Sequence, residues 1–180
     1  NFPQIYTDKP FNYSFYRQLD GTVRDLIKNV DYTLYEEGIY VGYRYFNTLN
    51  KKAIAYPFGF GLSYTSFSFD KMNVSECEGG WKVKVSVTNT GKVAGKDVVQ
   101  LYVKAPKGSM DKPERELKGF AKTPLLSPGQ SCEVEISVTK ESLASYDEAA
   151  SEWVVDKGNY MFIAAKDSMD SSLKEKIRID

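Results

Sequence analysis

Two pairs of neighbouring carboxylates are the residues whose types could carry out chemistry. Glu36 stands beside Glu37, and Asp147 stands beside Glu148. Carboxylate pairs hydrolyse glycosidic bonds, but the two groups then flank the scissile bond across a cleft. Neighbours in an extended chain point their side chains in opposite directions, so neither pair suits that task. We expect the first pair to be exposed or to pair with Arg44, and the second to lie in a solvated loop between strands.

Other reactive side chains are few. The chain has no histidine, which removes the commonest general base and the commonest zinc ligand. Cys77 and Cys132 are too few for a closed four-ligand metal site. We expect two partly buried free thiols, and a disulfide is the alternative if the fold brings them together. Arg115 is expected to bridge Glu114, Glu116 or a neighbouring domain, which contributes little stability at a surface.

Residues 36–65 combine aromatic side chains with glycines. The aromatic residues are Tyr40, Tyr43, Tyr45, Phe46, Tyr56, Phe58, Phe60 and Tyr64, and the glycines are Gly38, Gly42, Gly59 and Gly61. Aromatic rings bring large apolar area, and glycine allows positive φ and close backbone approach. We expect a closely packed, irregular segment. Its rings either form a platform on which sugars stack or are buried between two domains, and the glycines favour burial.

Composition excludes several classes of protein. The 24 basic and 24 acidic residues balance, so we expect no nucleic-acid partner, which would require a basic excess or patch. No apolar run approaches the roughly 20 residues that span a bilayer, so we expect no membrane insertion. The hydrophobic content of 42% supports a core. Because the chain begins at Asn1, we expect a piece of a longer protein.

From Leu62 onward the sequence alternates between apolar and polar residues. The run 81–88 places tryptophan and valines on one side and lysine, serine and threonine on the other. The runs 99–103, 132–138 and 173–179 repeat this pattern, and turn residues separate them. Strands of this length without a long amphipathic helix predict an all-β, antiparallel β-sandwich.

Three local predictions complete this assignment. Residues 116–125 predict a short edge strand that Pro124 stops. Residues 151–166 predict two strands joined by a turn at Asp156 and Gly158. The spacing of Val23 with Leu26 and Ile27 gives a weak helical signal, and it predicts one short helical turn.

Several ordered motifs resemble the C-terminal portion of family 3 glycoside hydrolases, which include β-glucosidases and β-xylosidases. The segments 38–46 (GIYVGYRYF) and 56–67 (YPFGFGLSYTSF) are similar to the end of the family's second domain. The segments 87–106, 112–131 and 143–160 are similar to its fibronectin type III-like domain. The resemblance covers roughly residues 36–166.

The resemblance implies a fibronectin type III-like (immunoglobulin-like) sandwich over residues 62–180. Residues 1–61 would then be a mostly irregular extension, the tail of a preceding α/β sandwich domain. The family's retaining mechanism uses an Asp nucleophile from a (β/α)8 barrel and often a Glu acid/base from the α/β sandwich. Neither motif occurs in this chain. We therefore expect no catalytic, substrate-binding or metal-binding residue and no cofactor.

The expected function is a non-catalytic fragment of a β-glucosidase-like enzyme that braces the catalytic domains. Its partners would be those domains, and β-linked glycosides would be the parent's substrate. The alternatives are a module that binds polysaccharide through Tyr40, Tyr43, Tyr45 or Trp81, and a protein-interaction sandwich. The sequence leaves localisation open, with a periplasmic or secreted parent favoured over a cytoplasmic one.

Overall fold

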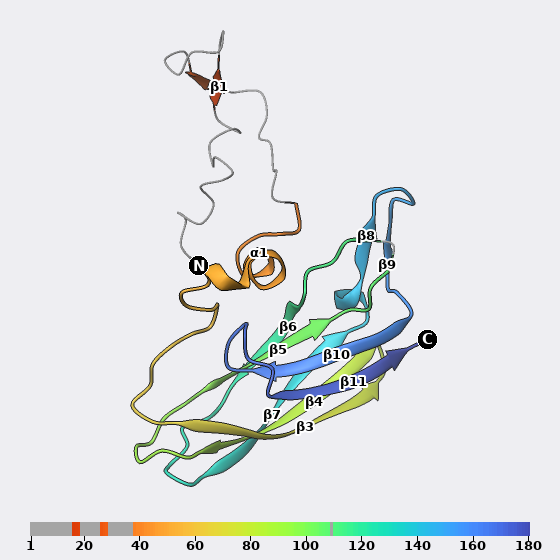
Figure 1. Cartoon of the computed structure of the whole chain (residues 1–180). Helices are drawn as coiled ribbons and strands as arrows, with labels where there is room; N and C mark the ends of the chain where they lie inside the picture. Colours follow the sequence, from red (N-terminus) through yellow and green to blue (C-terminus); the bar gives the residue numbers. More distant parts are fainter. Residues whose placement is uncertain (1–15, 19–25, 29–37, 109) are drawn as a thin grey trace.

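The predicted β-sandwich is confirmed by a computed structural model, which describes residues 16–18, 26–28, 38–108 and 110–180. Two antiparallel sheets face one another (Figure 1). The first has the order β3-β4-β7, with β3 at Phe67–Cys77, β4 at Gly80–Asn89 and β7 at Ser131–Thr139. The second has the order β11-β10-β5-β6, with β11 at Leu173–Ile179, β10 at Gly158–Ala165, β5 at Val98–Lys104 and β6 at Glu116–Lys122.

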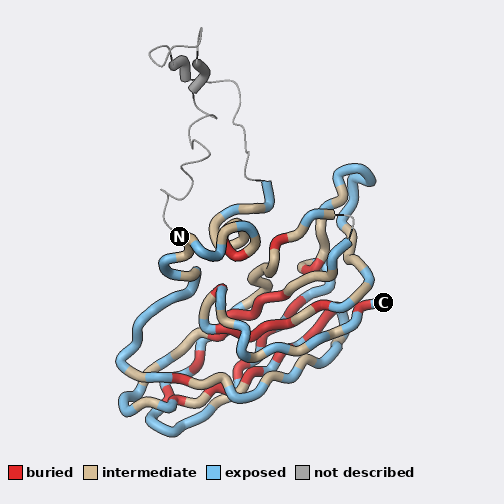
Figure 2. The backbone as a smooth tube through the Cα atoms, in the orientation of Figure 1, coloured by how far each residue is buried: buried red, intermediate tan, exposed pale blue. Residues whose placement is uncertain are grey.

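The core between the sheets follows from the alternation. Trp81, Val83, Val85 and Val87 of β4 are all buried, and the lysines between them are exposed. Val99, Leu101 and Val103 of β5 meet them from the other sheet. Figure 2 shows the buried residues concentrated between the two layers. Alternation works here because one face of each strand is covered by the opposite sheet.

Strand β5 and the second half of β10, residues 162–165, depart from this pattern because they are buried on both faces. Gln100 and Tyr102 of β5 are as inaccessible as the core residues that alternate with them. On β10, Ile163 and Ala165 occupy the same outer face. The cover comes from residues 38–65, hereafter the strap, which carries α1 (Tyr43–Leu49) and the 3-10 turn η2 (Lys51–Ala53). Figure 1 shows α1 on the side of the sandwich that carries β5 and β6.

Two local predictions are corrected. The strap is not wholly irregular, because its middle forms α1; seven residues are too few for a readable 3.6-residue period. The predicted helical turn is wrong at Leu26 and Ile27, which lie in β2 (Leu26–Lys28), paired antiparallel with β1 (Tyr16–Gln18). Val23 lies outside the described residues. Short apolar runs do not distinguish helix from strand.

The strand ends hold one further difference. Strand β9 (Glu152–Val154) and strand β10 both form on either side of the predicted turn, but β9 pairs with β8 (Ser145–Asp147), and β10 pairs with β5 and β11. The 3-10 turn η3 (Glu141–Leu143) leads into β8. Strand β6 pairs with β5 alone among the described strands and ends before Pro124, as predicted for an edge strand. None of the described helices has the length and apolarity to cross a membrane.

Candidate functional site

The strap is attached to the sheet through α1. The helix starts after Gly42, whose φ of 59° is in the left-handed region that glycine tolerates. Phe46 and Asn47 are its buried residues. The Asn47 side-chain amide donates to the backbone oxygen of Ser168 at 2.6 Å, and the Ser168 N–H donates to the oxygen of Phe58 at 2.8 Å. The loop after β10 therefore holds two parts of the strap at once.

Tyr43 is the main aromatic anchor. Its hydroxyl oxygen accepts a hydrogen bond from the Leu117 N–H at 2.8 Å. Its ring meets the Tyr102 ring edge to face, with centroids 5.7 Å apart, and stacks on the Phe58 ring at 5.4 Å. Such contacts add to the area that the rings bury. Tyr43 therefore links the helix, the strap beyond it and the edge strand β6.

Beneath Tyr43 lies a short polar network. The Tyr102 hydroxyl donates to Oε1 of Gln100 at 2.6 Å, and Nε2 of Gln100 donates to the Lys166 oxygen at 2.7 Å. Burial is the main cause that raises the pKa of Tyr102 well above its usual value, so the phenol stays a neutral donor. Both the oxygen and the nitrogen of the buried Gln100 amide are thus hydrogen-bonded.

Gly59 fits the predicted role of glycine in close packing. Its φ is 91°, and a Cβ placed there would lie 2.1 Å from Nε2 of Gln100. A side chain there would therefore displace either the Gln100 amide, with its hydrogen bonds, or the strap itself. Gly61 differs, because a Cβ there would meet no atom within 4 Å. The close approach is thus confirmed at Gly59 and is wrong at Gly38, Gly42 and Gly61, since a Cβ at Gly38 or Gly42 would also meet no atom within 4 Å.

Charged and polar contacts line the edge of the strap. Arg44 forms an ion pair with Glu116 at 3.3 Å. The Thr48 hydroxyl accepts from the Glu114 N–H at 2.8 Å, and the Tyr40 hydroxyl donates to the Asp111 carboxylate at 2.8 Å. These contacts orient the strap along the loop that leads into β6.

Two expected ion pairs have different outcomes. The expected partners of Arg44, Glu36 and Glu37, lie outside the described residues. Arg115 donates to the backbone oxygen of Asp170 at 2.6 Å, a partner that the sequence did not suggest. For Glu114, burial raises the carboxyl pKa, but the hydrogen bond from Lys104 and nearby positive charges, including Arg115, lower it below its usual value.

The other side of the strap is open. Tyr56, Phe58 and Phe60 are about half exposed, and Leu62 and Tyr64 are 93% and 97% exposed. No charged residue occurs from Ala53 to Phe69. An uncharged apolar surface of this kind marks a contact site for protein or membrane. The strap therefore has one face that is docked on the sheet and one that is not covered by any described residue.

The alternative sugar-binding residues are not arranged as a platform. Trp81 is only 6% exposed and packs against Phe162 in the core, so its predicted role in that alternative is wrong. Tyr43 is occupied by its contacts with the sheet, and Tyr40 and Tyr45 are partly buried. The strap thus resembles a seam more than a sugar-stacking surface.

The remaining reactive residues have structural surroundings. Asp147 accepts hydrogen bonds at Oδ1 from the N–H groups of Ala149 and Ala150, at 2.9 and 3.2 Å, and so shapes the turn after β8. Glu148 is exposed in that turn, as predicted, but the predicted loop position is wrong for Asp147, which is the half-buried last residue of β8. The cysteines are free thiols, as expected, and burial raises the pKa of Cys132. Among the described residues, no group of three His, Cys, Asp or Glu side chains is placed to hold a metal ion.

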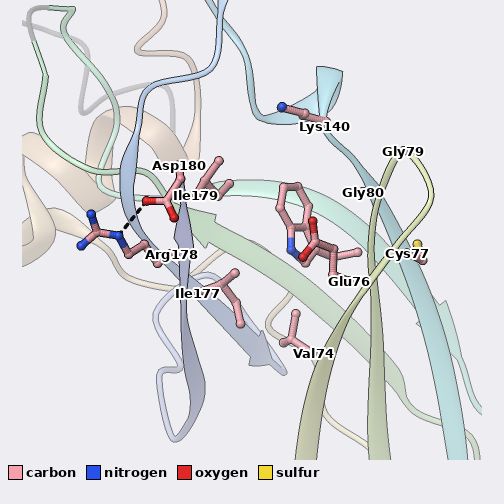
Figure 3. Close-up of a pocket in the computed structure, with 11 residues that line it drawn as sticks. Val74, Glu76, Cys77, Gly79, Gly80, Lys140, Ile177, Arg178, Ile179 and Asp180 are labelled. Atoms are coloured by element: carbon pink, nitrogen blue, oxygen red, sulfur yellow. Dashed lines mark hydrogen bonds and ion pairs between the residues drawn. The ribbon is translucent and has the colours of Figure 1, made fainter.

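A hollow of about 520 Å³ lies between the edges of β3 and β11, beside the end of the chain (Figure 3). Glu76 and Asp180 bring carboxylates to it, and Cys77 brings a thiol. A glycosidase needs one carboxyl group that is protonated near neutral pH. Arg178, at 2.8 Å, lowers the pKa of Asp180 and keeps it ionised. The arrangement does not supply a general acid at Asp180.

Sequence reasoning missed the polar residues under the strap. Gln100 and Asn47 are buried polar residues: Gln100 joins the sheet to the segment after β10, and Asn47 joins the strap to that same segment. Gln100 had a detectable signal, because it lies in the nearly continuous apolar run of residues 98–103. Such a run is typical of a strand that is buried on both faces. Asn47 had none, because its partner is a backbone oxygen far away in the sequence.

Comparison with known proteins shows which domain family and which enzymes this chain resembles. The sequence profile of the fibronectin type III-like domain family matches residues 97–168. The chain is 41% identical to β-glucosidase A of Butyrivibrio fibrisolvens and 42% identical to thermostable β-glucosidase B of Acetivibrio thermocellus. These alignments cover 79% and 81% of the chain. The chain spans about a fifth of the length of each of these relatives.

Solved structures agree. The chain resembles β-glucosidase 3B from Thermotoga neapolitana in complex with α-D-glucose, with a TM-score of 0.76 and 46% identity over 81% of this chain and 20% of that one. It also resembles the GH3 β-glucosidase of Bifidobacterium adolescentis, with a TM-score of 0.75 and 37% identity over 80% of this chain and 21% of that one. The chain therefore contains a fibronectin type III-like domain of the kind carried by family 3 (GH3) β-glucosidases.

Proposed function

We propose that this chain is a non-catalytic part of a β-glucosidase-like glycoside hydrolase and that it braces catalytic domains lying outside it. The parent would hydrolyse terminal β-linked glucosyl or related residues. Residues 1–61 would belong to the tail of a preceding α/β sandwich domain, and residues 62–180 to the fibronectin type III-like domain. Support comes from the similarity to β-glucosidases over about a fifth of their length.

The single observation that carries the bracing role is the open face of the strap. Leu62 and Tyr64 are almost fully exposed, although the strap beside them is fixed to the sheet by Tyr43, Asn47 and Gly59. An uncharged surface suits a second protein surface, and the contacts of the neighbouring strap residues reduce the backbone ordering that docking would require. Burying one leucine contributes about 1.5–3 kcal/mol, so covering this face with a neighbouring domain would stabilise the pair.

The bracing role is tested by making the same substitution in two proteins. Leu62→Asp with Tyr64→Asp should leave the thermal midpoint of the 180-residue chain unchanged, since both side chains are exposed there. In the full-length parent the pair should lower the thermal midpoint, because charge would enter a buried seam. Phe120→Asp, on the exposed edge of β6, is the matched control in both. An unchanged midpoint in the parent would exclude the bracing role.

The non-catalytic claim has its own test. The purified 180-residue chain is incubated with aryl β-glucosides and aryl β-xylosides at several pH values. We expect release of the aryl group at the rate of the buffer alone. Turnover above that background, lost when Glu76 or Asp180 is replaced by its amide, would show that the hollow in Figure 3 is catalytic and would overturn the claim.

A further inference from the structure

A second aromatic surface lies on the hairpin formed by β8 and β9. Tyr146 and Trp153 are direct cross-strand partners, so both side chains are on the same face of the hairpin. Their rings meet at an angle of 62° with centroids 5.4 Å apart. Tyr146 is 48% exposed and Trp153 is 72% exposed. The tyrosine thus supports the indole while leaving most of it accessible to a ligand.

The turn fixes this arrangement. Asp147 ends β8 and accepts two backbone hydrogen bonds from the turn at Ala149 and Ala150. Such a side-chain cap stabilises the tight turn that keeps β8 and β9 in register. Because register sets which residues share a face, the cap keeps Trp153 opposite Tyr146. The surface is therefore organised before any ligand arrives.

Two hollows meet at Trp153. One, of about 500 Å³, continues from the hairpin to Ile39 and Arg44 of the strap and to the loop at Pro113. The other, of about 480 Å³, lies over Ala144 and Val155. Both volumes fall in the range of about 300–1,000 Å³ that is usual for small-molecule sites. The indole therefore forms a wall that is shared by two adjoining depressions.

Charged side chains surround the indole without partners. Glu141 lines both hollows, Glu148 lines the first and Lys140 the second. None of these three side chains forms a hydrogen bond or an ion pair with another described residue. Carboxylates accept hydrogen bonds and an ammonium group donates them. The site therefore offers an accessible aromatic face together with both kinds of charged hydrogen-bonding group.

We propose that the β8–β9 hairpin binds a β-linked glucosyl chain, with Trp153 as the stacking residue. In a β-glucosyl unit the ring faces carry C–H groups and the rim carries hydroxyls. The C–H groups fit the electron-rich face of an indole, and the hydroxyls can pair with Glu141, Glu148 and Lys140. This site is separate from the strap, so the proposal does not depend on the bracing role, and only the choice of a β-linked glucosyl ligand rests on the proposed activity of the parent.

A protein partner fits this surface less well. The centres of protein interfaces are depleted of charged residues, and an unpaired charge that is buried there is costly. Around Trp153 three unpaired charges lie within the two hollows. The open face of the strap has none between Ala53 and Phe69. The strap therefore suits a protein surface, and the hairpin suits a hydroxyl-rich ligand that remains partly in water.

Binding is measured by titrating the 180-residue chain with cellohexaose and, separately, laminarihexaose. The chain has two tryptophans, and Trp81 is buried in the core, so a change in tryptophan emission reports on Trp153. Calorimetry gives the affinity of each variant. We expect Trp153→Ala to weaken binding at least tenfold, and Glu148→Gln to weaken it severalfold. Phe120→Ala removes another exposed ring and should leave affinity unchanged.

Three results would overturn the proposal. The first is no heat and no change in emission with either oligosaccharide at millimolar concentration. The second is an equal loss of affinity in the Trp153→Ala and Phe120→Ala variants. The third is that Trp153→Ala retains affinity but lowers the thermal midpoint of the full-length parent, which would make the hairpin a docking arm. Because the strap variants Leu62→Asp and Tyr64→Asp leave the hairpin intact, failure here is distinguishable from failure of the bracing role.

Discussion

The outer faces of the two sheets have opposite characters. On the three-stranded sheet, Lys82 pairs with Glu135 at 3.2 Å and Lys84 pairs with Glu133 at 3.0 Å, all in contact with water. On the four-stranded sheet, the outer face carries Tyr102, Ile163 and Ala165, and the strap covers them. The outer face of the three-stranded sheet is thus exposed to solvent, whereas the outer face of the four-stranded sheet forms a second, smaller core with the strap.

The difference shows how the sandwich is oriented in a larger protein. A face covered by cross-strand ion pairs needs no neighbour, because its side chains are already solvated. The other face is covered by the strap, and the strap in turn exposes apolar side chains such as Leu62 and Tyr64. This face therefore suits contact with a neighbouring domain. We therefore expect changes under the strap to have large effects and changes on the charged face to have small ones.

Phe46→Ala should have the largest effect. The side chain is fully buried beneath α1, and its removal leaves a cavity, so we expect a loss of about 3–5 kcal/mol in the free energy of unfolding. Urea denaturation measures it. Leu49→Ala, on the exposed side of the same helix, is the control and should change stability by less than about 0.5 kcal/mol. Equal effects would mean that the strap is not a second core.

Gly59→Ala should be next in size. The substitution places a Cβ at a positive φ and against the Gln100 amide, so we expect a cost of about 1–3 kcal/mol. Gly61→Ala is the matched control, because a Cβ there enters open space. The two thermal midpoints measured side by side give the comparison. A Gly59→Ala variant with an unchanged thermal midpoint would show that close contact between the strap and β5 does not contribute to stability.

Tyr43→Phe tests the hydroxyl alone. The ring contacts remain, but the Leu117 N–H loses its acceptor. An unsatisfied buried group costs about 1–3 kcal/mol, and we expect the lower part of that range because Leu117 is only half-buried. Hydrogen exchange should show faster exchange of the Leu117 amide in particular. Tyr56→Phe removes an exposed hydroxyl and should change neither quantity.

The pH dependence of the free energy of unfolding should report on Asp170, which lies in the loop after β10 that holds the strap. Burial alone would raise the pKa of Asp170, but hydrogen bonds from Ser172 and Lys166 and the charge of Lys166 lower it below its ordinary value. A lowered folded-state pKa gives stability that is present above the unfolded pKa, near 4, and lost as pH falls through the folded value. Asp170→Asn should therefore lower stability at pH 7 and flatten its decline below pH 4.

Urea midpoints at pH 7, 4 and 2.5 measure this dependence. The difference between the two proteins should be greatest at pH 7 and should shrink as the pH falls toward and through the lowered folded-state pKa of Asp170. A difference that stays constant with pH would mean that Asp170 acts through packing and not through its charge.

The sequence predicts the sandwich better than it predicts the strap. Alternation from Trp81 to Val87 identifies the core face directly. Successive residues of this strand face the opposite sheet and the solvent in turn, so every second residue is apolar. The strap follows no period, since α1 has only seven residues and starts at a glycine. Such a short helix depends on the packing of Phe46 and Tyr43 rather than on helix propensity.

The candidate sites were predictable to different degrees. The density of aromatic residues correctly indicated a packed segment, and Gly59 fits the expected close approach. Trp81 lies on the same side of its strand as Val83 and Val85, so the alternation already placed it in the core, and its proposed sugar-binding role conflicted with that pattern. Trp153 was missed because it precedes two valines and resembles an ordinary core strand; only its pairing with Tyr146 in a projecting hairpin leaves it exposed.

Lys84→Ala with Glu133→Ala should have the smallest effect. The hydrogen bond and charge of Glu133 raise the pKa of Lys84, but both side chains are about half exposed. Water and salt screen such a pair, and exposed pairs contribute little to stability. We expect both single variants and the double variant to have thermal midpoints close to that of the unsubstituted chain at 0.15 M salt. A loss comparable to that of Gly59→Ala would mean that the charged face is as structural as the covered one, and the contrast between the two sheets would then no longer indicate where a neighbouring domain binds.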